Sequence, residues 1–335
     1  MTLNLHDFWK MIQRPRANPF PDVIGTYMAR DALLLAISML GLNRTDTVLL
    51  PAYLCREVVK PFLGRTRVVF YDVKSDLGID PLEIENRLKG VKLLLIINYF
   101  GFLQPHREQI RELCKKHEVI LLEDCAHSLL TEGSGSTGDI AVFSFRKNLP
   151  LPDGGGLKFN GGGIRNVASF QPKLYSNALS VMSLLKSFSR IQSSTLSRSG
   201  LSQKLKSSPH TLPLSTLASN GLGNLSFARI IEKQRADYQY WLDALHDSAR
   251  TIPLFKALPC GVCPLGFPVA VEDRDGLATR LQKAGVLVKI HWRLPDLIGE
   301  EFSTSHRLAK TLLTLPIYPE LSHKHRDTIL AALDS

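Results

Sequence analysis

The sequence predicts an α/β protein with two parts: a large domain built on a mostly parallel central sheet, and a small C-terminal α+β domain. Helix-type and strand-type segments alternate between residues 27 and 145, as in a parallel sheet covered by helices. A second, shorter alternation follows a long predicted helix at 226–248. A chain of 335 residues is long enough to bury two cores. We therefore expect a large domain at 1–240 and a small domain at 241–335.

The elements of the large domain follow from apolar patterning and from residues that start or stop helices. Residues 1–25 indicate a leader with a Pro-rich turn, and residues 27–40 a helix without internal Gly or Pro. Asp80 followed by Pro81 is typical of a helix start. The run at 91–98 does not alternate, as in a strand buried on both faces. The predicted strands are 47–50, 67–73, 91–98, 119–123 and 140–145, and further helices are predicted at 56–63 and 105–117.

The small domain is predicted from shorter segments of the same kinds. Its expected strands are 266–271 and 286–292, and its expected helices are 274–284, 306–313 and 322–333. Cys260 and Cys263 form a Cys-x-x-Cys pair without a second pair at the spacing of a zinc site, so we expect no metal.

The positive charge of the chain is concentrated in one interval. The net charge is +10, and after Asp153 the next acidic residue is Glu232. Such a field favours an anionic ligand or surface; the alternative is a solvated basic loop. Residues 171–215 form a Ser-rich, basic insertion. Apolar residues at helical spacing within 177–206 predict either packing on the domain or weak peripheral membrane contact.

The composition excludes several classes of protein. No apolar run approaches the roughly 20 residues of a membrane span, and the N-terminus lacks the apolar core of a signal peptide. Five cysteines in a chain of this length do not form a disulfide framework, so we expect a cytoplasmic protein. The basic interval lacks the interleaved aromatic residues of a single-strand nucleic-acid platform, so no nucleic-acid partner is expected.

Two polar side chains follow strands of the predicted sheet. Asp124 follows the strand at 119–123, and Lys147 follows the strand at 140–145. Carboxyl ends of parallel strands meet at one edge of a sheet, where ligands bind. A lysine amine forms a Schiff base with a carbonyl, as in pyridoxal 5'-phosphate (PLP) enzymes, and a carboxylate keeps the pyridine nitrogen protonated. The helix that opens at residues 29–31 can supply N–H groups to a phosphate. The alternative for either side chain alone is a surface charge.

Several ordered blocks resemble one enzyme family. The blocks EDCAH (123–127) and GDIAVFSFRKNLPLPDGGG (138–156) resemble the DegT/DnrJ/StrS-type sugar aminotransferases, which are fold-type I PLP enzymes. The segments RDALLLAISMLGLNRTDTVLLPAY (30–53), INYFGF (97–102) and AGVLVKIHWRLP (284–295) extend the resemblance over most of the chain. It implies a fold-type I large domain, PLP as the cofactor, and a homodimer with a shared active site.

The resemblance also implies roles for individual residues. Lys147 is expected to be the Schiff-base lysine, and Asp124 the partner of the pyridinium nitrogen. His127 is expected against the ring or its 3-hydroxyl, and Tyr53 to stack on the ring. His291, in the segment IHW, matches a family pair of a histidine and an aromatic residue near the active site, and it is expected near the substrate.

The phosphate side departs from the family pattern. The resemblance implies that Ser144 binds the phosphate together with the turn of Ala29, Arg30 and Asp31. However, Ser144 and Lys147 are three positions apart, about two fewer than the family uses, and Arg30 stands where the family often has Thr. A guanidinium can also bind phosphate. A trimmed turn before the lysine is the simplest explanation.

The resemblance implies an aminotransferase that moves an amino group, from glutamate, to a nucleotide-linked keto-sugar for glycan, polysaccharide or amino-sugar synthesis. Two alternatives remain open. One is a PLP enzyme with a non-nucleotide substrate, acting by transamination or dehydration. The other is a non-catalytic relative with a binding or regulatory role, for which the short turn between Ser144 and Lys147 is the only indication.

Overall fold

The computed structural model describes residues 5–15, 17–161, 176–182, 211–318 and 321–334. A seven-stranded sheet forms the centre, in the order β1-β7-β6-β5-β4-β2-β3. Strands β2 to β6 run parallel to one another. Strand β7 is antiparallel to β6, and β1 is antiparallel to β7. The α/β prediction with a mostly parallel sheet is therefore confirmed. The bounds are β1 Ile24–Thr26, β2 Thr47–Pro51, β3 Arg67–Tyr71, β4 Val91–Ile97, β5 Ile120–Cys125, β6 Ile140–Phe143 and β7 Gly155–Phe159.

Two antiparallel strands at one side of the sheet were not predicted from the sequence. β1, the edge strand, overlaps the end of the predicted leader, and β7, between β1 and β6, begins in a glycine run that carries no strand signal. Close packing against the start of α2 explains why glycine occupies the start of β7. A Cβ at Gly155 would lie 2.2 Å from the carbonyl carbon of Met28, so only glycine lets β7 approach the start of helix α2 (Ala29–Met39) this closely. This contact fixes the helix N-terminus beside the ends of the central strands.

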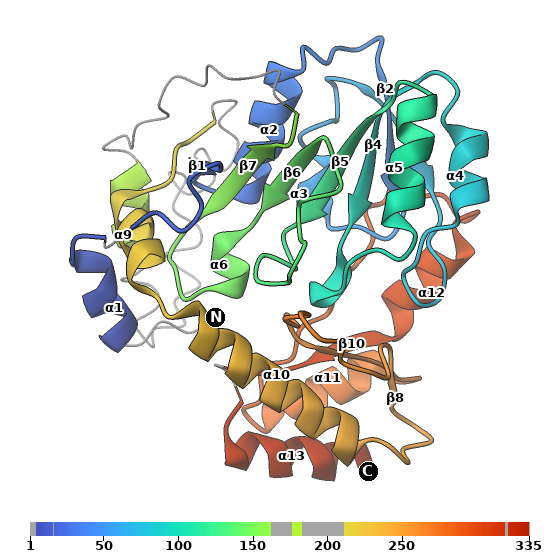
Figure 1. Cartoon of the computed structure of the whole chain (residues 1–335). Helices are drawn as coiled ribbons and strands as arrows, with labels where there is room; N and C mark the ends of the chain where they lie inside the picture. Colours follow the sequence, from blue (N-terminus) through green and yellow to red (C-terminus); the bar gives the residue numbers. More distant parts are fainter. Residues whose placement is uncertain (1–4, 16, 162–175, 183–210, 319–320, 335) are drawn as a thin grey trace.

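The predicted elements of the large domain are present, with boundaries shifted by a few residues. The predicted strand at 140–145 ends two residues early, because Phe145 already begins the short helix α6 (Phe145–Asn148). The other helices of this region are α1 Leu5–Ile12, α3 Arg56–Val59, α4 Pro81–Arg87, the 3₁₀ turn η1 Tyr99–Gly101, α5 Arg107–Lys116 and α9 Thr216–Asn224. Figure 1 shows them around the central sheet, with α4 and α5 side by side.

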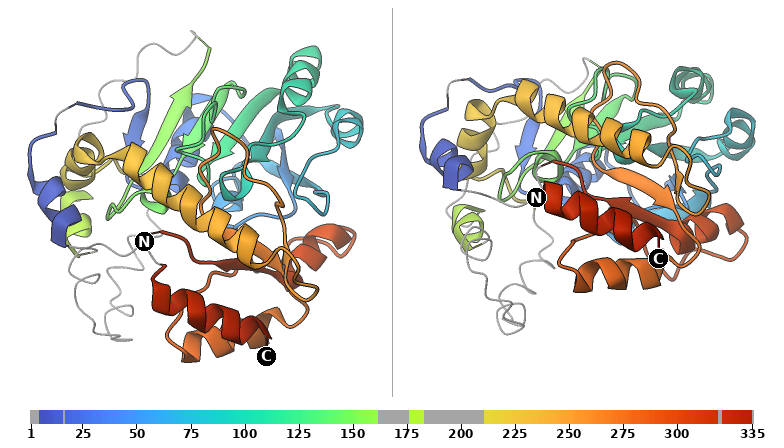
Figure 2. Two further views of the ribbon diagram at one scale, coloured as in Figure 1. Left: turned by 60° about the horizontal axis from the view of Figure 1, so that its bottom comes forward. Right: turned by 90° about the horizontal axis from the view of Figure 1, so that it is seen from below.

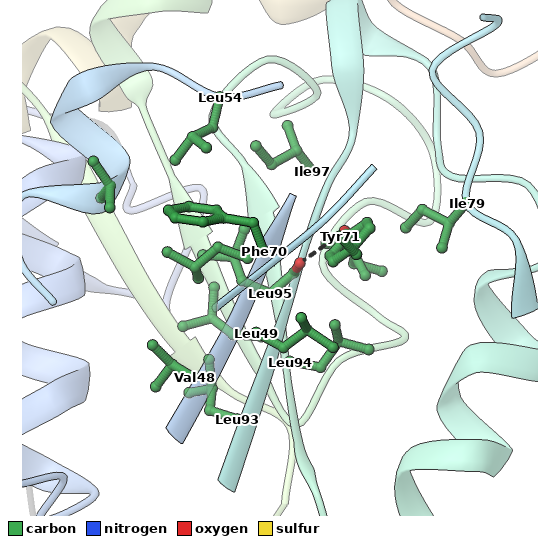
Figure 3. Close-up of a cluster of buried hydrophobic side chains, with 14 of the residues drawn as sticks. Val48, Leu49, Leu54, Phe70, Tyr71, Ile79, Leu93, Leu94, Leu95 and Ile97 are labelled. Atoms are coloured by element: carbon green, nitrogen blue, oxygen red, sulfur yellow. Dashed lines mark hydrogen bonds between the residues drawn. The ribbon is translucent and has the colours of Figure 1, made fainter. Parts of the chain in front are cut away.

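The main core lies along the central strands. Leu93, Leu94 and Leu95 of β4 are buried, as are Val48 and Leu49 of β2, which agrees with a strand enclosed on both faces. Figure 3 shows these side chains together with the hydroxyl of Tyr71, which donates to the carbonyl of Leu95 at 3.0 Å. The buried phenol thus keeps a hydrogen-bond partner inside the core.

The C-terminal region has its own three-stranded antiparallel sheet and its own core. The sheet has the order β10-β9-β8, formed by β8 Ile252–Pro253, β9 Phe267–Ala270 and β10 Leu312–Leu315. The helices are α10 Phe227–Ala244, α11 Arg274–Lys283, α12 Ser303–Thr311 and α13 His323–Asp334. Tyr238 and Trp241 of α10 are buried in this second core, and α13 packs beside α10 (Figure 2).

Two predictions in the C-terminal region are wrong. Residues 286–292 form no regular strand; they make one isolated bridge between Lys289 and Thr314. The predicted helix at 306–313 starts earlier, at Ser303, and gives way at Leu312 to strand β10. In both cases a short apolar run fits either type of element, and pairing with β9 decides that Leu312–Leu315 is a strand.

Much of the basic insertion at 171–215 lies outside the described residues, as does most of the segment 177–206 that was considered for membrane contact. Its described parts are helical residues 176–182 and residues 211–215, which lead into α9. Across the described ranges, no helix is both long and apolar enough to span a bilayer.

Candidate active site

The carboxyl end of β5 carries two adjacent buried carboxylates with different surroundings. Glu123 accepts hydrogen bonds from the side-chain amide of Asn98 at 2.7 Å and from the backbone N–H groups of Gly135, Thr137 and Gly138. Asp124, which is only 4% exposed, accepts one bond, from the N–H of Ala126 at 2.9 Å.

Burial raises the pKa of Asp124, while the nearby charge of Lys147 and the Ala126 N–H lower it. Glu123 therefore serves the fold by holding the glycine-rich loop at 133–138. Asp124 keeps acceptor capacity for a ligand.

His127 lies just beyond β5 and is fully enclosed. Its Nδ1 accepts the backbone N–H of Phe100 at 3.3 Å, so in the neutral ring the proton is assigned to Nε2. Nε2 is buried without a hydrogen-bond partner among the described residues. Burial, followed by the charge of Lys147, lowers the pKa of His127 well below its ordinary value. The ring is thus neutral, with a donor at Nε2 that makes no hydrogen bond within the described part of the chain.

Lys147 lies on α6, one strand away from Asp124. Its side chain keeps solvent contact through a cleft, but the surrounding protein desolvates the ammonium and lowers its pKa, while the charge of Asp124 raises it. Asn148 fixes this turn to the end of β5, because its side-chain amide donates to the carbonyls of Ala126 and Ser144, each at 3.0 Å. Lys147 was predicted from the sequence, whereas the buried Asn148, which positions it, was not. The only sequence feature that points to Asn148 is its place next to Lys147.

The predicted phosphate turn lies at the start of α2. Met28 occupies the N-cap and makes no side-chain cap bond. The N–H of Asp31 donates to the Met28 carbonyl at 2.9 Å, so the N–H groups of Ala29 and Arg30 are the ones that another acceptor can reach. The guanidinium of Arg30 is ion-paired with Glu57. Asp31 is buried in the first turn, and burial raises its pKa to about 6.

Ser144 and Arg146 lie on the other side of this turn. Ser144 is buried at the start of α6 and makes no cap bond. Arg146 is exposed, and its Nη1 lies 3.3 Å from the Sδ of Met28. The guanidinium of Arg146 thus contacts the side chain of the N-cap residue of α2, which the sequence did not indicate.

Aromatic residues from both parts of the chain surround His127. Tyr53 is fully buried, with its ring centroid 5.3 Å from Trp292 and 5.8 Å from Tyr99. Its hydroxyl has no partner among the described residues. Trp292 also lies 5.3 Å from the ring of His127. The predicted stacking of Tyr53 on a cofactor stays a prediction. Trp292 is the aromatic residue of the predicted His-aromatic pair.

His291 joins the C-terminal region to this site. Its ring lies 5.4 Å from that of His127, and its Nδ1 is 2.8 Å from the hydroxyl oxygen of Thr314. Burial, with the charges of Lys147 and Lys289, lowers the pKa of His291 to about 3. Thr314 also lines the cleft into which Lys147 opens. The structure therefore brings His291 into the neighbourhood of Lys147, as predicted from the sequence.

These residues fit the ring of PLP. The site holds a buried carboxylate with spare acceptor capacity and two buried polar atoms without partners in the described chain, His127 Nε2 and the Tyr53 hydroxyl. Buried polar atoms are rarely left unpaired, so such a cluster indicates a missing ligand with polar atoms of its own. Cys263, the second residue of the Cys-x-x-Cys pair, is buried, and its thiol donates a hydrogen bond to the side-chain oxygen of Gln234 at 2.9 Å.

Comparisons with known proteins identify a family that matches nearly the whole chain. A family model of the DegT/DnrJ/EryC1/StrS aminotransferases matches residues 21–334. The dTDP-3-amino-3,6-dideoxy-alpha-D-galactopyranose transaminase of Aneurinibacillus thermoaerophilus is 24% identical over 327 residues, covering 93% of this chain and 84% of the relative.

Two solved structures share the fold. Helicobacter pylori PseC, an aminotransferase involved in the biosynthesis of pseudoaminic acid, aligns with a TM-score of 0.73 at 17% identity, covering 99% of this chain and 96% of PseC. NtdA of Bacillus subtilis, solved with bound PMP, aligns with a TM-score of 0.72 at 16% identity, covering 99% of this chain and 82% of NtdA. The predicted fold is confirmed.

Proposed function

The chain belongs to the DegT/DnrJ/EryC1/StrS aminotransferase family, and from this premise we propose that it is a PLP-dependent aminotransferase acting on a nucleotide-linked keto-sugar. Glutamate is the proposed amino donor. The name of the Aneurinibacillus relative, a transaminase of a dTDP-linked amino sugar, supports the acceptor class. The bound PMP of NtdA supports the cofactor.

One observation carries the proposal. Asp124 lies near the carboxyl end of β5, and Lys147 lies on α6, which follows the neighbouring parallel strand β6. The charge of each residue perturbs the pKa of the other. Burial raises the pKa of the carboxyl and lowers that of the amine, which is the pattern of paired groups in a reactive site. Asn148 bridges the two segments, so the spacing does not depend on a flexible loop.

PLP, when bound, supplies an electrophilic carbonyl and an electron-withdrawing ring. Around it, each residue has a separate task. Lys147 Nζ would hold the carbonyl carbon, with the carbonyl oxygen leaving as water, and its amine would be placed to take and return a proton as general base, which its lowered pKa favours. Asp124 would accept a hydrogen bond from the protonated ring nitrogen. His127 would donate from Nε2 to the ring oxygen, because its Nδ1 is already an acceptor for Phe100.

The phosphate is proposed to lie at the uncapped N-terminus of α2, beside Ser144. Helix N-termini favour anions through their free N–H groups and dipole. Arg146, at 3.3 Å from Met28, supplies the positive charge there, since Arg30 is engaged by Glu57. This proposal keeps Ser144 and the start of α2 from the predicted phosphate site and assigns the charged contact to Arg146 in place of Arg30.

We also propose a cytoplasmic homodimer with shared active sites and no nucleic-acid partner. The family membership supports this assembly. Sedimentation equilibrium should give twice the monomer mass of 37.3 kDa. A monomeric species with full activity would contradict it.

The test of the function follows the amino group. Purified protein, PLP and ¹⁵N-glutamate are incubated with dTDP- and UDP-linked keto-sugars, and products are analysed by mass spectrometry. Label in an amino sugar supports the proposal, and Lys147→Ala should abolish transfer. Lys92→Ala, at the exposed position of β4, is the matched control. Formation of 2-oxoglutarate with non-nucleotide acceptors alone would favour the non-nucleotide alternative. No transfer with any acceptor would overturn the proposal.

A further inference from the structure

The cleft that opens at Lys147 has a buried amide in its wall. The cleft lies between α6 and the C-terminal region, and its empty volume is about 390 Å³, including its open mouth. This size is in the range of small-molecule sites. Gln234 of α10 lines the cleft and is only 3% exposed. Because a side-chain amide has donor hydrogens on one side and an acceptor oxygen on the other, a buried amide needs partners at both ends.

The oxygen end of this amide is satisfied by the protein. The thiol of Cys263 donates to Gln234 Oε1 at 2.9 Å, and burial raises the pKa of this thiol to about 12, so it stays a donor. This contact assigns the oxygen to Cys263 and turns the nitrogen away from it. Nε2 makes no hydrogen bond within the described residues, and it is not among their fully enclosed polar atoms without a partner. Its N–H groups therefore face the cleft that Gln234 lines.

The segment that carries Cys263 is fixed to the segments that follow β4 and β5. The N–H of Cys263 donates to Oγ1 of Thr131 at 3.0 Å. The N–H of Leu265 donates to the carbonyl of Phe100 at 2.9 Å, and the N–H of Phe100 in turn binds Nδ1 of His127. The amide is thus held at a set place relative to the proposed ring site of the cofactor. A donor that is positioned by such contacts suits the recognition of a ligand.

We infer that Gln234 determines specificity for the keto-sugar, because its Nε2 donates to an oxygen on a ring carbon next to the keto carbon. The inference rests on the proposed function and names a contact of its second substrate. During transfer the keto carbon must lie close to Lys147, so the groups on its neighbouring carbons enter this cleft. In a sugar these groups carry hydroxyl or acetamido oxygens, which are neutral acceptors that an uncharged N–H matches. The amino-acid donor presents carboxylates, which form stronger hydrogen bonds with cations than with an amide.

The first test compares Gln234→Met, which keeps the length of the side chain and removes the amide, with Gln239→Met as the control. Gln239 is an exposed glutamine of the same helix. Single-turnover absorbance measures the half-reactions with glutamate and with the dTDP- or UDP-linked keto-sugar separately. Loss of one hydrogen bond should raise the apparent Kd for the keto-sugar about 5- to 10-fold in Gln234→Met. The Kd for glutamate should stay unchanged, and Gln239→Met should match the parent protein.

Two further readouts exclude a merely structural role. Among keto-sugars that each lack one hydroxyl or acetamido group, one analogue should bind the parent more weakly than the complete sugar does, yet bind Gln234→Met equally well. Cys263→Ala, which removes the bond that orients the amide, should also weaken keto-sugar binding, and Cys263→Ser, which keeps a donor, should restore it. These two variants leave Gln234 in place and decide the matter if Gln234→Met does not fold. Parent-like keto-sugar affinity in both would overturn the inference.

The outcomes separate this inference from the proposed function. An unchanged keto-sugar Kd in an active Gln234→Met protein would overturn the inference and leave the function standing. Weaker glutamate binding, alone or to the same degree as weaker keto-sugar binding, would assign the amide to the donor or to the shape of the cleft and also overturn it. A parent protein that binds PLP but transfers no amino group to any keto-sugar would refute the function instead.

Discussion

The two ends of the proposed cofactor site differ in how their polar groups are satisfied. At the ring end, Asp124 accepts one hydrogen bond, and His127 Nε2 and the Tyr53 hydroxyl have no partner among the described residues. At the phosphate end, Arg30 is ion-paired with Glu57. The ring end is thus prepared for a ligand, whereas part of the phosphate end is occupied by the chain itself.

The two ends also differ in how closely the sequence resembles the family. The ring end lies in the blocks that carry the resemblance. At the phosphate end, Ser144 and Lys147 are about two positions closer than in the family pattern, and Arg146 lies beside Met28. We propose that the chain keeps the family's groups at the ring and anchors the phosphate differently.

The largest expected effect is at the ring end. Asp124→Asn removes the carboxylate from the ring nitrogen while preserving the size of the side chain. Loss of one preorganised electrostatic group typically lowers kcat on the order of 10²- to 10³-fold. The melting temperature should be unchanged or higher, since burial disfavours this carboxylate in the folded chain. Steady-state kinetics and calorimetry check both. Full activity in the variant would remove Asp124 from the site.

Glu123→Gln tests the neighbouring carboxylate, whose role is structural. It accepts four hydrogen bonds from described donors, and replacing one oxygen with an amide leaves buried N–H groups without an acceptor. The expected loss of unfolding free energy is about 3 kcal/mol. Urea unfolding measures it, and the folded fraction should retain its kcat. A stable but inactive variant would show that the roles of the two carboxylates were assigned in the wrong order.

At the phosphate end, Arg146→Gln should weaken PLP binding about 10-fold, because a charge-assisted hydrogen bond to the phosphate is lost. Pyridoxal, which lacks the phosphate, should bind the variant and the parent equally. Fluorescence titration with both ligands measures this difference. Arg44→Gln, a surface arginine bonded to the Gly64 carbonyl, is the control. Equal losses for PLP and pyridoxal would place Arg146 away from the phosphate.

The last prediction concerns the pH dependence of stability at Asp31. Its pKa rises from an ordinary 3.8 to about 6 in the folded chain, so the folded state binds the proton more tightly than the unfolded state. The resulting stability is fully present below the unfolded pKa and is lost as pH rises through about 6. Asp31→Asn should therefore be relatively more stable at neutral than at acidic pH, by about 1–3 kcal/mol. Unfolding at a series of pH values checks this. A pH-independent difference would contradict the shift.

The parts of the molecule that sequence reasoning predicted are those with local signals. Unbroken apolar runs gave the central parallel strands, and the blocks around Asp124 and Lys147 gave the ring end. β7 was missed because Gly155 and Gly156 have no strand propensity, and only the approach of α2 explains them. Residues 286–292 were assigned as a strand from their apolar content, although their neighbours offer one bridge only.

The missed site residues depend on tertiary contacts. Asn148 matters because it reaches two carbonyls, one of them on the segment after β5. Arg146 matters through a partner that is distant in sequence, Met28. Neither Asn148 nor Arg146 has a pattern that distinguishes it from a surface residue in the sequence alone.

The central claim is that Lys147 holds PLP next to Asp124. The most direct measurement is borohydride reduction of the purified protein with PLP, followed by peptide mass spectrometry, with and without prior addition of glutamate. The proposal predicts that PLP mass is added to the peptide containing Lys147 and that glutamate prevents the addition by releasing the lysine. Labelling of another lysine, or unchanged labelling after glutamate, would contradict it.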